Sequence, residues 1–113
     1  MRVWAAIRAR SRRLPSAPVG SYIAAMQSDA ELKRLRWRAH HRGTFEADLL
    51  VGAFFDAHHQ SWDSAERKMF AEMLEEQDVD ILAWASGTAE APDRYQGPML
   101  NALQKLDYVT TAV

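Results

Sequence analysis

The sequence lacks cysteine, and its hydrophobic residues never gather into a long run. Without cysteine the chain cannot form a disulfide bond, a thiolate metal site or a cysteine nucleophile. A membrane-spanning helix needs about 20 consecutive apolar residues, and no stretch approaches that length. The composition is otherwise ordinary, because 48% of the 113 residues are hydrophobic and 26% are charged. We therefore expect one small globular domain without membrane insertion.

Acidic residues are missing from the first 27 positions, which contain five arginines. Pro15 and Pro18 interrupt any helix in this stretch, so we predict that residues 1–27 form a disordered basic extension. A secretory signal is excluded because the required apolar stretch is absent. An organelle transit peptide has a similar composition, rich in arginine and serine, and is the alternative interpretation of this segment.

The two parts of the chain have opposite charge. Residues 1–42 contain ten basic and two acidic residues, whereas residues 43–113 contain four basic and thirteen acidic ones. This separation produces a dipolar field that can orient the protein toward a charged partner. A small nucleic-acid-binding module that uses the basic part is one alternative function. The acidic remainder and the lack of a basic recognition helix argue against it.

Capping signals and helical spacing predict an all-α fold. We expect a compact bundle of five short helices within residues 28–108, followed by a short tail at 109–113. Ser28 with Glu31, and Asp63 with Glu66, have the spacing of a capping box, which marks the start of a helix. The predicted helices span residues 29–41, 44–57, 64–76, 79–86 and 98–106.

The spacing of apolar residues also predicts the core. One apolar face is expected on each helix, and the tryptophans of the domain are expected to be mainly buried. The predicted core residues are Leu32, Leu35, Trp37, Ala39, Phe45, Leu49, Leu50, Ala53, Phe54, Trp62, Met69, Phe70, Met73, Leu74, Ile81, Leu82, Trp84, Met99, Leu100, Leu103 and Leu106.

The junction between the first two predicted helices has the most informative pattern of side chains. Gly43 can end a helix and lets another molecule approach the backbone closely. Arg42 offers a planar fork of five donors, and Glu46 lies in a first helical turn, where a carboxylate is favoured. A simple helix end with a surface ion pair would explain the same residues.

The run Arg42-Gly43-x-x-Glu46 matches the RGxxE signature of the SdhE family, and the surrounding sequence resembles that family over about residues 31–106. Val79 and Ala53 stand where the family often has proline, and neither change affects the signature. The stretches that match best are residues 34–38, 46–55, 62–66 and 73–84.

The resemblance implies a function as well as a fold. Members of the family are similar to five-helix bundles that bind the flavoprotein subunit of succinate dehydrogenase or fumarate reductase and promote covalent attachment of FAD. It implies a protein that is not an enzyme, that is a monomer when free, and that acts on FAD held by its partner without binding a cofactor tightly. The partner-binding residues that it implies are Arg42, Gly43 and Glu46, with His41 and Asp48 as additions.

The location follows from the interpretation of the N-terminal segment. A bacterial family member is cytoplasmic, whereas a transit peptide would place the protein in the mitochondrial matrix.

Metal binding and catalysis have little support in the sequence. The pairs His40-His41 and His58-His59 are adjacent, and neighbouring residues on a helix point about 100° apart, so neither pair resembles the one-face chelate of a zinc helix. No nucleophile–base set or phosphate-binding loop is present either, which makes a small enzyme the weakest alternative.

Overall fold

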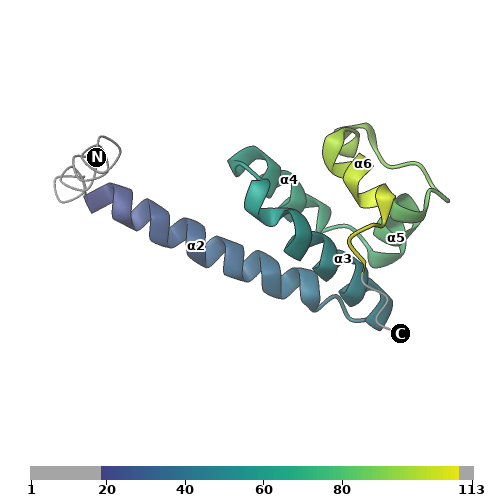
Figure 1. Cartoon of the computed structure of the whole chain (residues 1–113), viewed down its shortest axis with the longest axis horizontal. Helices are drawn as coiled ribbons and strands as arrows, with labels where there is room; N and C mark the ends of the chain where they lie inside the picture. The colour runs from purple at the N-terminus through teal and green to yellow at the C-terminus, as the bar shows by residue number, and fades with distance from the viewer. Residues whose placement is uncertain (1–18, 110–113) are drawn as a thin grey trace, which may run out of the picture. The chain divides into compact units, whose positions relative to one another are not determined.

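The computed structural model describes residues 19–109 (Figure 1). Within this part of the chain all regular structure is helical, with five α-helices and two short 3-10 helices and no strand. The all-α prediction is therefore confirmed. The elements are α2 (Val19–His40), α3 (Phe45–His58), η2 (His59–Ser61), α4 (Ser64–Met73), α5 (Asp78–Ser86), η3 (Asp93–Tyr95) and α6 (Pro98–Lys105).

Helix α2 corrects the predicted start of the first helix. It begins at Val19 and has 22 residues, so residues 19–27 are helical and not part of a disordered extension. Ser28 lies inside the helix instead of capping it. The preceding residues contain no proline and several good helix formers, so the helix continues through the capping pattern. The rest of the predicted extension, residues 1–18, lies outside the described residues.

The chain divides into two units, residues 1–32 and 33–113, and the division falls within α2. The described part of the first unit is a helical segment with exposed side chains such as Ile23 and Met26. The second unit is a compact helical bundle that contains the core. The candidate site described below also belongs to this second unit.

The core of the second unit is aromatic at its centre. Phe70 of α4 lies 5.7 Å from Phe55 and 4.8 Å from Trp62, measured between ring centroids. Phe54 contacts the ring of Tyr108 edge-on at 5.1 Å. The predicted capping box of Asp63 and Glu66 is present at the start of α4. The packing of these rings joins α3 and α4 to the C-terminal segment.

The buried face of α3 differs from the prediction. Phe45 is 81% exposed and Leu49 is 40% exposed, whereas Ala47 and Val51 are buried with Phe54 and Phe55. Phe54 is buried as predicted. Because the helix is apolar on more than one side, however, spacing alone wrongly placed Phe45 and Leu49 in the core. The bulky pair Phe54 and Phe55 decides the orientation because it fills the core.

Two other predicted core residues are also exposed. Trp37 is 61% exposed on α2, and Leu106 is 40% exposed just after α6. Leu106 has a left-handed backbone with φ of 56°, which ends the helix before its side chain could turn inward. Trp84 is buried as predicted.

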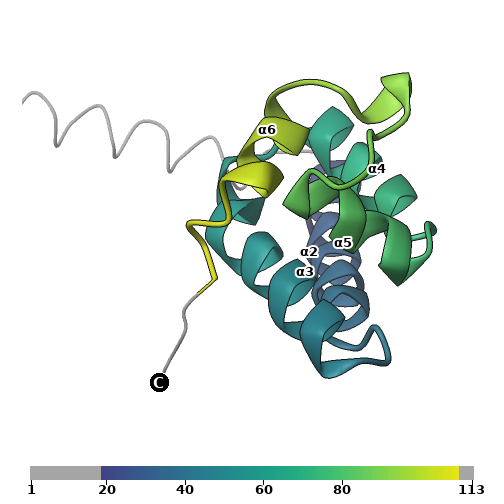
Figure 2. The same ribbon diagram turned by 90° about the vertical axis from the view of Figure 1, so that its right-hand side faces the viewer.

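The last turn of α2 packs on α3 at Gly52, and Figure 2 shows the two helices next to each other. A β-carbon at Gly52 would lie 2.5 Å from Nδ1 of His40, so the imidazole occupies the space that a side chain would need. Nε2 of the same ring lies 3.1 Å from a carboxylate oxygen of Asp56. The absence of a side chain at Gly52 thus makes room for the imidazole of His40 between the two helices.

Replacing Gly52 with alanine should therefore destabilise the protein. The added methyl would displace the His40 ring, at a cost of about 1–3 kcal/mol in the free energy of unfolding. Denaturant unfolding of Gly52→Ala, alone and combined with His40→Ala, measures this. Without the imidazole the alanine should be neutral or stabilising, because alanine favours a helix more than glycine does. Equal costs in both backgrounds would contradict the packing argument.

Residues 88–97 contain a core residue that the sequence did not reveal. Tyr95 in η3 is buried, its ring lies 5.5 Å from that of Trp84, and its hydroxyl donates to Oε2 of Glu76 at 2.7 Å. Arg94 pairs with the same carboxylate. The hydrogen bond from Tyr95 lowers the pKa of Glu76, and burial, followed by this bond, raises the pKa of Tyr95 to about 12.

These two pKa shifts predict a pH dependence of stability. Because the pKa of Glu76 is lowered in the fold, its contribution is present above the ordinary value of 4.5 and is lost as the pH falls below it. The contribution of Tyr95 is present below pH 10 and is lost as the pH rises toward about 12. Denaturant unfolding at a series of pH values gives the curve of unfolding free energy against pH. Glu76→Gln should flatten the acid side of this curve, and Tyr95→Phe should flatten both its acid and its alkaline side. An unchanged acid side in Glu76→Gln would disprove the assignment.

Candidate functional site

The loop between α2 and α3 contains an exposed glycine with a positive φ angle. Gly43 has φ of 113°, a region that L-residues rarely adopt, and no atom lies within 4 Å of where its β-carbon would be. The loop is therefore open on that side, and a partner could approach its backbone closely. Thr44 then starts α3 by accepting a hydrogen bond from the Ala47 amide at 3.2 Å.

Arg42 extends from this loop into the molecule. Its Nε donates to Oδ1 of Asp78 at 2.7 Å, and its two terminal nitrogens donate to the carbonyl oxygens of Leu74 at 2.8 Å and Glu76 at 3.0 Å. These carbonyls lie just after α4, and Asp78 begins α5. The side chain is only 10% exposed. Arg42 thus joins the end of α2 to the turn between α4 and α5.

Asp48 holds the same loop from the α3 side. Its Oδ1 accepts hydrogen bonds from the backbone amides of Arg42 and of Gly43, the latter at 3.2 Å. Because both amides follow the end of α2, this carboxylate fixes the path of the chain between the two helices. Asp48 was expected to bind a partner, and the structure gives it a positioning role in the loop.

The surface ion pair between Arg42 and Glu46 that the alternative interpretation of this junction assumed is absent from the described residues, and Arg42 makes three hydrogen bonds inside the molecule instead. Direct contact between Arg42 and a partner therefore stays a prediction. Glu46 is exposed in the first turn of α3, and none of the described residues pairs with it. Of the two charged residues in the signature, only Glu46 has no partner among the described residues.

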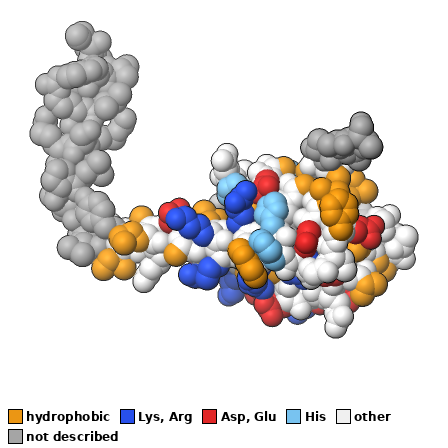
Figure 3. Space-filling model, turned by 90° about the horizontal axis from the view of Figure 1, so that it is seen from below, with side chains coloured by type: hydrophobic (Ala, Val, Ile, Leu, Met, Phe, Trp, Pro, Cys, Tyr) orange, Lys and Arg blue, Asp and Glu red, His pale blue; other side chains and the backbone are white. Residues whose placement is uncertain are grey.

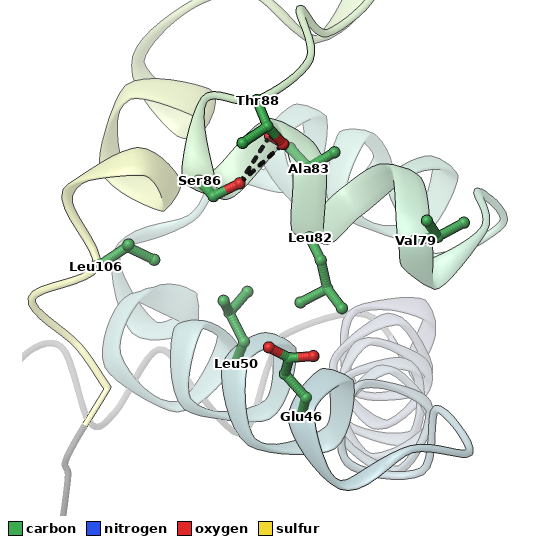
Figure 4. A pocket seen from close by; sticks show the side chains of 8 residues that line it. All are labelled: Glu46, Leu50, Val79, Leu82, Ala83, Ser86, Thr88 and Leu106. Carbon is green, nitrogen blue, oxygen red and sulfur yellow. Dashed lines mark hydrogen bonds between the residues drawn. The ribbon is translucent and has the colours of Figure 1, made fainter.

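Glu46 lines a groove between α3 and α5 (Figure 4). The groove has a volume of about 430 Å³. Figure 4 shows the Glu46 carboxylate, Leu50 and Leu82 pointing into the space between the two helices, with Leu106 at its edge. The lining residues are Glu46, Leu50, Val79, Leu82, Ala83, Ser86, Thr88 and Leu106.

His41 forms an exposed aromatic pair with Trp37. The two rings stack with centroids 4.3 Å apart, and Nδ1 of His41 lies 2.7 Å from the Trp37 carbonyl oxygen. In the space-filling view, basic side chains gather along α2 and histidine side chains lie next to them (Figure 3). The sequence placed Trp37 in the core because it lies beside the buried residues of that helix.

Metal-ligand geometry is not found among residues 19–109, where no group of three or more histidines and carboxylates could hold an ion. The ring of His40 is bound to Asp56, and Nδ1 of His59 lies 2.9 Å from the Phe55 carbonyl oxygen. In the same part of the chain no helix is long and apolar enough to cross a membrane.

The arginine clamp on the turn between α4 and α5 predicts a large stability effect. Arg42→Ala would leave the Asp78 carboxylate and two carbonyls without their donor, so the free energy of unfolding should fall by about 2–3 kcal/mol. The matched control is Arg36→Ala, because the ion pair of Arg36 with Asp56 is exposed and such pairs contribute less than about 1 kcal/mol. Urea unfolding measures both variants, and equal losses would argue against the clamp.

Comparison with known proteins identifies the family. Residues 33–107 match the family described as flavinator of succinate dehydrogenase. The FAD assembly factor SdhE of Acetobacter pasteurianus is 33% identical over 88 residues, which are 78% of this chain and 81% of that protein. The SdhE of Aliivibrio fischeri is 30% identical over 78 residues, 69% of this chain and 90% of its own length.

Mitochondrial proteins are also similar. The succinate dehydrogenase assembly factor 2 of Schizosaccharomyces pombe is 35% identical over 68 residues, which are 60% of this chain and 49% of that protein. The family match includes the whole junction with Arg42, Gly43 and Glu46. Since it spans well over half of the sequence, the chain belongs to the succinate dehydrogenase flavinator family.

Proposed function

We propose that this protein is an assembly factor that binds the flavoprotein subunit of succinate dehydrogenase and promotes covalent attachment of FAD to it. The observation that carries the proposal is the family match over residues 33–107. The relatives that the chain resembles include bacterial FAD assembly factors and mitochondrial succinate dehydrogenase assembly factors. The free carboxylate and the open glycine of the junction are the features that suit contact with a partner.

The mechanism that we propose is preorganisation of the partner. A protein that binds one conformation of the flavoprotein more tightly than another raises the population of that conformation. If it is the one in which the flavin and the attacking side chain are close, attachment becomes faster. The chemistry would belong to FAD and the flavoprotein, so this chain would contribute binding energy and not a catalytic group.

The proposal also covers a second partner, the oligomeric state of the protein and its location in the cell. Fumarate reductase, which also has a flavoprotein subunit, is a second partner in this proposal. We propose that the free protein is a monomer without a tightly bound cofactor. We place it in the bacterial cytoplasm, with the mitochondrial matrix as the alternative if the arginine-rich N-terminal segment is a transit peptide.

The nucleic-acid-binding alternative loses support from the ion pairs of the basic helix and its junction. Arg36 pairs with Asp56, Arg38 pairs with Glu75, and Arg42 pairs with Asp78. Each of these arginines is partly neutralised inside the molecule, so fewer charges remain for phosphates.

A flavin attachment assay tests the proposal. The flavoprotein subunit without covalent flavin is mixed with FAD and this protein, and flavin fluorescence is followed in the flavoprotein band of a denaturing gel. Wild-type protein should accelerate attachment. Glu46→Ala should reduce that acceleration at least about tenfold, since interface hot spots commonly contribute this much. Gly43→Arg should abolish it, because arginine obstructs the open face of the loop and also strains a backbone conformation that favours glycine.

The matched control is Glu72→Ala, which removes an exposed carboxylate from α4. This variant should behave as wild type, and thermal unfolding should show that Glu46→Ala is as stable as the control. Attachment at the same rate with and without wild-type protein would refute the proposed function. A loss of acceleration in Glu72→Ala equal to that in Glu46→Ala would show that no specific carboxylate is involved.

A further inference from the structure

We propose that the groove between α3 and α5 binds a segment of the flavoprotein subunit that carries apolar side chains next to a lysine or arginine. This inference rests on the proposed function and adds the contact surface and the chemistry of the segment. It concerns residues outside the RGxxE signature, namely Val79, Leu82 and Leu106. Together with Glu46 they form a surface that is apolar except for one charged group.

The groove is suited to apolar side chains. Leu50 comes from α3, Leu82 and Ala83 come from α5, and Leu106 follows α6, so three parts of the chain contribute carbon surface to one depression. At the rim Val79 is 68% exposed. Surface depressions that combine apolar walls with a few polar groups are typical binding sites.

The hydroxyl groups in the groove, those of Ser86 and Thr88, already have hydrogen-bond partners. Oγ of Ser86 donates to the Ala83 carbonyl oxygen at 3.2 Å and lies 3.1 Å from Oγ1 of Thr88 (Figure 4). Among the residues that line the groove, Glu46 is therefore the one with an unpaired charge. An occupant that covers this carboxylate must compensate its charge, because a buried charge without a partner is costly, and a lysine or arginine forms the strongest hydrogen bonds to it.

The carboxylates near the groove strengthen this charge argument. The first turn of α3 contains Glu46 and Asp48, and the first turn of α5 contains Asp78 and Asp80. Asp78 is paired with the guanidinium of Arg42, whereas Glu46 has no partner among the described residues and Asp48 accepts only from neutral backbone amides. The negative charge at the start of α3 is therefore not compensated inside the molecule. Electrostatic complementarity of this kind selects a basic segment over an acidic one.

Two leucines with the same exposed fraction allow a matched test. Leu106 lines the groove and Leu49 does not, and both are 40% exposed. In binding measurements with purified flavoprotein subunit, Leu106→Lys should raise Kd at least about tenfold. The substitution removes apolar contact, and the new cation repels the basic segment. Leu49→Lys should stay within about threefold of wild type. Equal effects of the two substitutions would overturn the proposal.

Val79 tests the sign of the charge. Val79→Lys and Val79→Glu both remove apolar surface from the rim, but only the lysine repels a cationic segment. We expect Val79→Lys to weaken binding about tenfold more than Val79→Glu does. Equal weakening by both variants would show that the segment is not basic. Circular dichroism verifies that the helical content of both variants equals that of wild type.

Cross-linking identifies the occupant. A photoreactive phenylalanine derivative at position 79 should attach to a flavoprotein peptide in which a lysine or arginine neighbours apolar residues. Attachment only to a second copy of this chain, or only to its own C-terminal residues, would overturn the proposal. If wild-type protein does not bind the flavoprotein at all, the proposed function fails. If it binds and Leu106→Lys binds equally well, only the groove assignment fails.

Discussion

The guanidinium of Arg42 is the contact on which the arrangement of the site depends. It donates to a carboxylate at the start of α5 and to two carbonyls that follow α4. Carbonyls at the end of a helix lack partners within the helix, so one side chain satisfies groups that would otherwise need water. The same contact ties the loop after α2 to the opposite side of the groove.

The position of Glu46 follows from this arrangement. Arg42 holds the loop against the turn between α4 and α5, and Asp48 holds the loop amides against α3. Between these two anchors Gly43 takes a backbone conformation that favours glycine. The chain then enters α3 with Glu46 directed into the groove (Figure 4). A partner would therefore meet a glutamate whose backbone position is set before binding, which lowers the entropy lost on association.

The sequence allowed the helical elements and much of the core to be predicted, because capping and spacing are local signals. It failed where a choice depended on distant residues. On α3, Phe54 was predicted correctly, but Phe45 and Leu49 were wrongly assigned to the core because they are as apolar as the buried Phe54 and Phe55. Tyr95 was missed because its burial depends on Glu76 and Trp84, which lie more than ten positions earlier.

The same limit applies to the signature. Sequence placed Arg42, Gly43 and Glu46 together at a helix junction and gave both charged residues the same role toward a partner. Packing separates those roles, because Asp78 and the two carbonyls lie more than 30 positions from Arg42 in the chain. Arg42 makes three bonds inside the molecule and stabilises the junction, and contact of either charged residue with a partner stays a prediction.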